Sequence, residues 1–178
     1  MNRAMKVLAI AVLLVTLAGA CVVLYGMNTL VPQVEQMTVS RISASEAPEA
    51  FEALRVQLEE GTFSGRLYGE TESLNAEDSW FETCTVRLHN RGFFPAEWIS
   101  LDVVPVSSTD GGGEDVLQVA DQGAYVLIAG SRGDLSATVL TTLPQGAQPR
   151  QVRVTCYVLG REITFEVTQT ESLTGNGG

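Results

Sequence analysis

A long segment without charge near the N-terminus constrains this chain more than any other feature. No charged residue lies between residues 7 and 34. Residues 7–26, VLAIAVLLVTLAGACVVLYG, form an apolar stretch of 20 residues. A helix needs about 20 such residues to cross a hydrocarbon core of ~30 Å. The sequence therefore predicts a transmembrane helix over residues 7–26, with the lipid bilayer as its partner.

The charges on either side of this segment predict its orientation. Arg3 and Lys6 precede it, and the next charge after it is Glu35. Because cytoplasmic flanks carry an excess of Lys and Arg, we expect residues 1–6 in the cytoplasm and the rest of the chain outside it. We interpret residues 7–26 as the uncleaved signal anchor of a single-pass cell-membrane protein.

Two other outcomes of processing stay open. Ala18-Gly19-Ala20 fits the small-residue pattern of a signal-peptidase site. The residues LAGAC at 17–21 are similar to a bacterial lipoprotein cleavage box, in which Cys21 would be acylated. The intact anchor is favoured because Val22-Val23-Leu24-Tyr25 continues the apolar run beyond both sites. All three outcomes leave the C-terminal part of the chain outside the cytoplasm.

The remainder of the chain is acidic and poor in catalytic residue types. With 178 residues, the chain can form about one domain besides the membrane segment. All nine cations after residue 26 are arginines, against 21 acidic residues, which argues against a nucleic-acid partner. Lys6 is the only lysine and His89 the only histidine. We therefore predict that the protein is not an enzyme and has no catalytic or cofactor-binding residues.

Two segments are expected between the anchor and the main domain. Residues 27–45 lack a clear period and contain Pro32, so we interpret them as a stalk. Residues 46–61 are predicted to form a short helix, because their apolar side chains Phe51, Leu54 and Leu58 recur at helical spacing. Alternation within the same segment leaves a strand as the second interpretation.

From residue 62 the pattern changes to short alternating segments separated by Gly, Asn, Asp and Pro. The candidate strands are residues 62–68, 80–89, 97–106, 116–119, 124–128, 134–143, 151–159 and 162–168. Seven or eight short strands at this spacing predict an antiparallel β-sandwich over residues 62–170. Residues 171–178 are expected to form a flexible tail.

The last two candidate strands predict a hairpin. Gly160-Arg161 fits a two-residue type II′ turn with glycine first. This turn pairs Val158 with Ile163, Cys156 with Phe165, and Val154 with Val167. It also places Thr155 opposite Glu166 on the solvent side. Every apolar residue on the inner face then meets an apolar partner.

Two cysteines are expected to face the core of the sandwich. Cys84 shares its strand face with Val86, and Cys156 shares its face with Val154. In an oxidising compartment a Cys84–Cys156 disulfide is favoured. The alternative is a pair of free buried thiols that pack as small hydrophobic side chains.

The order Cys84, Trp98, Cys156 resembles in spacing the Cys–Trp–Cys framework of immunoglobulin domains. The segments TVRLHNRGFFPAEWISLDV and VLIAGSRGDLSATV are also similar to adhesion-type β-sandwich domains of bacterial surface proteins. The resemblance implies an immunoglobulin-like β-sandwich that serves as a binding or structural module. Trp98 departs from the framework, since its alternation with Ile99 and Leu101 directs it away from the core.

Aromatic residues gather around one predicted turn of this domain. Phe93, Phe94 and Trp98 surround the turn that follows Asn90. If exposed, they would form a platform for a partner. We favour the interpretation that they close one end of the sandwich.

Three other motifs are weaker. Asp110, Glu114, Asp115 and Asp121 could supply oxygen ligands for Ca²⁺, but they lack EF-hand spacing and an ordinary glycine loop explains the segment. Arg132-Gly133-Asp134 is the integrin-recognition tripeptide, expected in an exposed turn before a strand. His89 is expected to be an ordinary surface histidine beside Arg87. No metal site is predicted.

Together these features predict a membrane-anchored extracytoplasmic β-sandwich. We expect it to act as a noncatalytic binding or accessory module of the cell envelope, with another envelope protein as its partner. The alternative is a structural subunit of a larger membrane or surface complex, without a ligand of its own.

Overall fold

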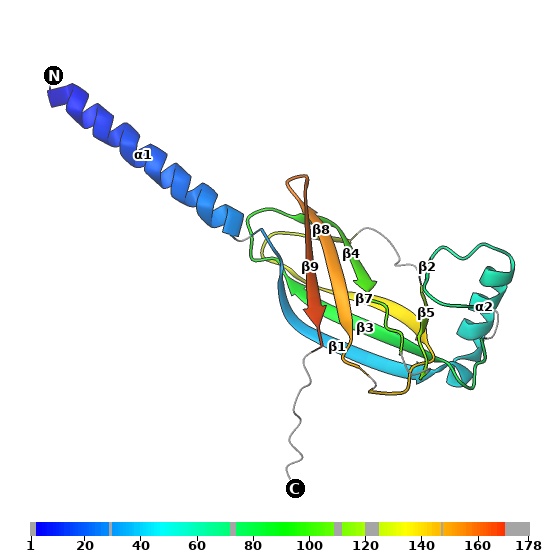
Figure 1. Ribbon diagram of the computed structural model, residues 1–178. Coiled ribbons are helices and arrows are strands. Elements are labelled where there is room, and N and C mark those ends of the chain that lie inside the picture. Colours follow the sequence, from blue (N-terminus) through cyan, green and yellow to red (C-terminus); the bar gives the residue numbers. More distant parts are fainter. Residues whose placement is uncertain are drawn as a thin grey trace, which may run out of the picture.

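One long apolar helix leads into a mainly β domain (Figure 1). The computed structural model describes residues 3–28, 30–71, 74–108, 112–119, 125–146 and 148–169. The predicted tail at residues 171–178 lies outside this range.

Helix α1 (Arg3–Asn28) extends away from the β domain (Figure 1). Its segment Met5–Leu24 is long and apolar enough to cross a membrane, and no part of that segment is buried. A signal sequence has the same properties. Leaving so many apolar side chains in water would be costly, so this helix requires an apolar environment that the β domain does not provide.

The described strands form two antiparallel sheets. The first has the order β1-β3-β7-β5-β2, and the second has the order β6-β4-β8-β9. The strands are β1 (Gln33–Ser43), β2 (Arg66–Leu67), β3 (Trp80–His89), β4 (Ala96–Val103), β5 (Asp115–Gln118), β6 (Tyr125–Leu127), β7 (Arg132–Thr141), β8 (Gln151–Val158) and β9 (Arg161–Thr168). The mainly β prediction is confirmed. Of the eight predicted strands, only the one at 62–68 is much reduced, to the two residues of β2.

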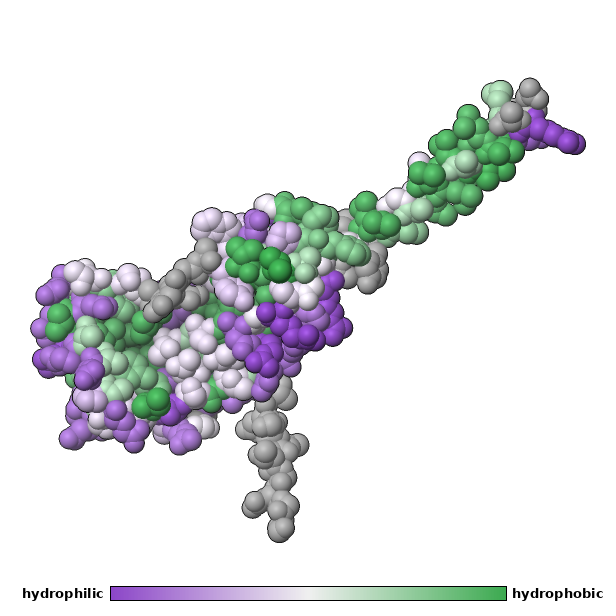
Figure 2. Space-filling model, turned by 180° about the vertical axis from the view of Figure 1, so that it is seen from behind, coloured by the Kyte–Doolittle hydropathy of each residue, from purple (hydrophilic) through white to green (hydrophobic). Residues whose placement is uncertain are grey.

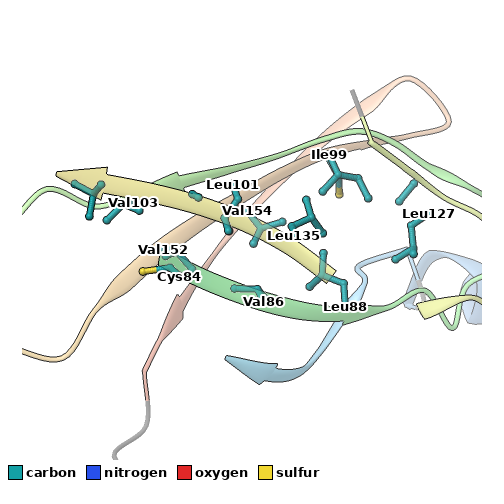
Figure 3. Close-up of a cluster of buried hydrophobic side chains, with 14 of the residues drawn as sticks. Cys84, Val86, Leu88, Ile99, Leu101, Val103, Leu127, Leu135, Val152 and Val154 are labelled. Carbon is teal, nitrogen blue, oxygen red and sulfur yellow. The ribbon is translucent and has the colours of Figure 1, made fainter. Parts of the chain in front are cut away.

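The inner faces of both sheets supply one hydrophobic core (Figure 3). Leu88 and Val86 enter it from β3, Leu101 from β4, and Val154 from β8. These side chains alternate with exposed or half-buried neighbours along their strands, as the period of two in the sequence requires.

The predicted stalk at residues 27–45 is wrong, because most of it is strand β1. This strand pairs antiparallel with β3 from Gln33↔His89 to Ser43↔Trp80. Its inward side chains Met37 and Val39 pack against the core. The alternation is hidden in the sequence by a register shift between Val34 and Gln36.

The predicted short helix is confirmed as α2 (Pro48–Glu59), preceded by the 3-10 turn η1 (Ala44–Glu46). Leu54 is the buried side chain of α2 and packs with Leu117 and Leu140 of the five-stranded sheet. Gly61 follows the helix with φ of +66°, a conformation that glycine adopts at little cost. The helix therefore covers one end of this sheet's outer face (Figure 1).

The predicted β8–β9 register is wrong by two residues. The turn consists of Leu159 and Gly160, whose φ angles of 53° and 73° are those of a type I′ turn. Cys156 therefore faces Ile163, and Val154 faces Phe165. Gly160 is thus the second residue of the turn, whereas the prediction had it as the first. Because the shift is an even number, the inner and outer faces are unchanged.

The predicted Cys84–Cys156 disulfide is not formed, and both thiols are free and buried. The two cysteines face the same core from different sheets.

Candidate interaction surfaces

The aromatic turn lies at the end of the β domain from which α1 departs (Figure 1). Gln33, at the start of β1, pairs with His89 at the end of β3. The next residue, buried Asn90, donates from Nδ2 to the carbonyl oxygens of Phe94 and Leu127 at 2.8 and 2.9 Å. The amide of Gly130 donates to the carbonyl oxygen of Asn90 at 2.7 Å. These bonds hold the loops around residues 90–95 and 128–131 together beside the start of β1.

Trp98 is turned outward by a β-bulge in strand β4. The pairing of β4 shifts register between Ala96 and Ile99 with β6, and between Glu97 and Ser100 with β8. Trp98 has a φ of 51°, in the left-handed region that a bulky side chain rarely adopts. The sequence prediction that Trp98 faces away from the core is confirmed, although the bulge rather than simple alternation directs it.

The aromatic side chains do not close the end of the domain, so the favoured interpretation of a plug is wrong. Phe93 is 61% exposed, Phe94 38% and Trp98 66%. They belong to a larger group of exposed apolar side chains at the same end, which we call the proximal patch. The patch comprises Val31, Val34, Phe93, Phe94, Trp98, Tyr125, Val126, Ile128 and Leu159. Figure 2 shows hydrophobic surface at this end of the domain, next to α1.

A cluster of charged and polar residues lies beside the proximal patch. Arg132 donates from Nε to both carboxylate oxygens of Glu35, at 2.9 and 2.8 Å. His89 Nδ1 lies 3.0 Å from Oε1 of Glu35. The hydrogen bond from Arg132 lowers the pKa of Glu35, against the opposing effect of burial. His89, predicted as an ordinary surface residue, is therefore part of an ion cluster that joins β1, β3 and β7.

The predicted exposed turn at Arg132-Gly133-Asp134 is wrong, because these residues form the start of β7. Gly133 pairs with Leu88 inside the sheet. Asp134 accepts hydrogen bonds from Nε and Nη2 of Arg87 at 2.7 and 2.8 Å, which lowers its pKa. The tripeptide is thus occupied by contacts within the five-stranded sheet.

The outer face of the five-stranded sheet is lined with hydroxyl groups. Thr83 and Thr138 lie opposite each other, with their hydroxyl oxygens 2.9 Å apart. Thr85 and Ser136 form the next such pair, at 2.8 Å. This open face runs from the ion cluster at the proximal end to helix α2 at the other end.

An apolar groove lies where this face meets α2, and we call it the distal groove. Its volume is about 340 Å³. The lining residues are Ile42, Ala47, Ala50, Ala53, Leu54, Gln57, Phe81, Val119 and Thr138. The groove exists because alanine side chains of α2 face it. Larger side chains at these positions would fill the space between the helix and the sheet. Nothing in the sequence pattern indicated this groove, since it depends on how α2 is placed against β1 and β3.

The acidic residues weighed above as calcium ligands, for which a glycine loop was the favoured interpretation, have other contacts in the structure. Asp115 is buried and accepts hydrogen bonds from Nη1 of Arg150 at 2.9 and 2.7 Å. Glu114 does not accept a hydrogen bond from Arg150. Its carbonyl oxygen accepts a hydrogen bond from the backbone amide of Thr142. Asp110 and Asp121 lie outside the described residues. Within the described ranges, no three His, Cys, Asp or Glu side chains form a group that could hold a metal ion.

Arg150 and its partners form a buried ion network that the sequence analysis missed. Arg150 also donates from Nε and Nη2 to Glu82 at 2.6 and 2.9 Å. Burial lowers the pKa of Arg150, but its bonds to Glu82 and Asp115 outweigh this and raise it. The alternation of the sequence could have indicated this network. Glu82 lies on the same inward face of its strand as Cys84, and Arg150 has the same alternation as inward Val152. The network joins the two sheets, and a water-sized pocket of about 20 Å³ lies beside it, lined by Arg41, Glu82 and Arg150 among others.

Comparisons with known proteins give no functional assignment. No protein-family model and no curated protein matches the chain. A crystal structure of a Bordetella pertussis protein provisionally designated ApaA is similar at 20% sequence identity and a TM-score of 0.34. The similarity covers 76% of this chain and 89% of that one.

Proposed function

We propose that this protein is a single-pass membrane protein whose β domain lies outside the cytoplasm and acts as a noncatalytic binding or accessory module of the cell envelope. The observation that carries the proposal is α1, an apolar helix whose segment Met5–Leu24 is not buried and which leads within a few residues into a folded β domain. Arg3 and Lys6 at the start of α1 support a cytoplasmic N-terminus. The two stacked antiparallel sheets, each with an inward cysteine, support an immunoglobulin-like relationship.

The distal groove is the surface that best suits a protein partner. It is apolar, open and lies at the end of the domain away from α1, where another envelope protein can reach it. Its size fits a few apolar side chains, and the neighbouring hydroxyl groups of Thr83 and Thr138 can bind a backbone beside them. We assign to it an apolar segment of another envelope protein.

A pull-down from detergent extract tests this function. The tagged full-length protein is compared with Ala50→Arg and Ala53→Arg, which place a long charged side chain in the distal groove. Val56→Arg is the matched control, because Val56 is exposed on the same helix but does not line the groove. The proposal predicts that a specific envelope protein copurifies with the wild type and with Val56→Arg and is lost from both groove variants. Equal recovery from all four proteins, or no copurifying protein, contradicts it.

A further inference from the structure

The proximal patch and α1 lie within a few residues of each other along the chain. Helix α1 ends at Asn28 and β1 begins at Gln33. Between them, Leu30 packs against the core and Pro32 is buried. The connection is therefore short and held against the domain, so the proximal end of the domain must stay near the point where α1 ends.

We propose that the proximal patch inserts its aromatic and aliphatic side chains into the interfacial region of the lipid bilayer. This inference rests on the proposed membrane anchor and adds a second contact between the β domain and the same membrane. The occupant of the patch is thus the bilayer in which α1 is embedded.

The distribution of exposed apolar side chains supports this choice of occupant. After α1, the described part of the chain has three exposed large apolar side chains outside the proximal patch. These are Ile42, Val56 and Leu67, which lie around the α2 end of the domain. The rest gather at the end facing α1. Ile128, the first residue of the turn after β6, is 64% exposed, and Leu159, in the β8–β9 turn, is 68% exposed.

The chemistry of the patch is that of a membrane interface. Trp and Tyr side chains are enriched at the level of the lipid headgroups, where an apolar ring with a polar group meets a hydrated layer. Trp98 also keeps a costly left-handed backbone while its ring faces outward. Strain of this kind persists at functional positions more often than elsewhere. Contact with lipid gives the exposed ring the burial that the β domain does not provide.

The surrounding charges agree with this orientation. Arg91 and Arg161 are exposed at the rim of the patch and suit the phosphate groups of lipids. Three acidic residues, Glu35, Glu97 and Glu162, are exposed there as well. Of these, Glu35 is paired with Arg132, and Glu162 accepts a hydrogen bond from the Tyr157 hydroxyl. The opposite end carries the acidic surface of α2, including Glu52 and Glu59, which an anionic membrane would repel.

The two tryptophans provide a direct test, because they mark opposite ends of the domain. Trp80 pairs with Ser43 and Thr141, and its ring centroid lies 4.5 Å from the Arg41 guanidinium carbon, near α2. The full-length Trp80→Phe and Trp98→Phe proteins are reconstituted into vesicles of phosphatidylcholine and phosphatidylglycerol with acyl chains brominated close to the headgroup. Flotation of the vesicles shows whether the protein is anchored.

The proposal predicts that the Trp80→Phe protein, which retains Trp98, loses fluorescence in brominated vesicles relative to unbrominated ones. The Trp98→Phe protein is expected to lose none. Adding Ile128→Ser and Leu159→Ser to the Trp80→Phe protein should reduce the quenching, whereas adding Val56→Ser should not. Flotation without quenching of Trp98 overturns this inference but leaves the membrane anchor intact. In that case the proximal patch would contact a protein instead of lipid. Quenching of both tryptophans also overturns it. Loss of flotation overturns the anchor itself.

Discussion

Arg150 binds Glu82 through two hydrogen bonds of 2.6 and 2.9 Å, and both residues are buried. Glu82 belongs to β3 of the five-stranded sheet, whereas Arg150 directly precedes β8 of the four-stranded sheet. Asp115, from β5, binds the same guanidinium group. The two layers are therefore joined by an ion network as well as by the hydrophobic core.

Arg150→Met is expected to lower the free energy of unfolding by about 3–5 kcal/mol, because it leaves buried Asp115 without a cation and Glu82 with only its 3.5 Å contact to Arg41. Urea unfolding of the full-length protein in detergent measures this change. Arg153→Ala is the control, since Arg153 pairs with Glu166 at the surface, where an ion pair contributes at most about 1 kcal/mol. Similar losses in the two variants would contradict the role given to the network.

Cys84 and Cys156 are expected to react with a thiol reagent only after unfolding. Both are buried, and burial raises the pKa of each thiol, so little thiolate forms in the folded protein. Mass spectrometry after alkylation at pH 8, without a reductant, distinguishes the states. Modification of both residues in denaturant and of neither in buffer is the expected result. Resistance to alkylation in denaturant would mean that a disulfide is present after all.

The stability of the wild-type protein is expected to fall at alkaline pH partly because of Cys84. Burial raises the pKa of its thiol from 9.0 to about 12. A raised pKa in the folded state gives a contribution that is complete below pH ~9 and is lost as the pH rises toward 12, because the unfolded chain ionises first. Urea unfolding at several pH values should show a shallower decline for Cys84→Ala. Parallel declines would show that Cys84 does not titrate in this range.

Trp98→Gly and Trp98→Ala are expected to differ in stability. Glycine relieves the left-handed conformation at φ of 51°, whereas alanine retains the steric conflict of the β-carbon. The glycine variant should therefore be more stable than the alanine variant by about 1 kcal/mol. Thermal unfolding followed by circular dichroism measures the difference. Equal stabilities would indicate that the bulge relaxes when the ring is removed.

Local alternation was sufficient to predict most of the β domain. Strand β3 was predicted with its observed bounds, and the faces of β8 and β9 were assigned correctly even though their register was not. Register depends on which residues form the turn, and Leu159 in a left-handed conformation has no strong sequence signal. A two-residue error in register leaves the hydrophobic pattern intact, so the pattern cannot detect it.

Strand β1 shows why the location of the aromatic turn was not predictable. Its edge position, its bulge after Val34 and its inward Arg41 weaken the alternating pattern, so the segment resembles a stalk. A stalk would hold the domain away from the membrane. Only the pairing of Gln33 with His89 brings the turn with Phe93, Phe94 and Trp98 next to the end of α1.

The topology of the full-length protein in membranes tests the account most directly. Glu59 is exposed on α2, far from α1, so Glu59→Cys supplies an accessible thiol. Cells whose wall has been removed but whose cytoplasmic membrane is intact are treated with a membrane-impermeant maleimide, before and after permeabilisation. The wild-type protein, treated in the same way, measures the labelling of the native cysteines. Labelling of Glu59→Cys in intact cells, with the protein in the membrane fraction, is the expected result. Labelling only after permeabilisation, or recovery of the uncleaved chain in the soluble cytosolic fraction, would contradict an anchored extracytoplasmic β domain.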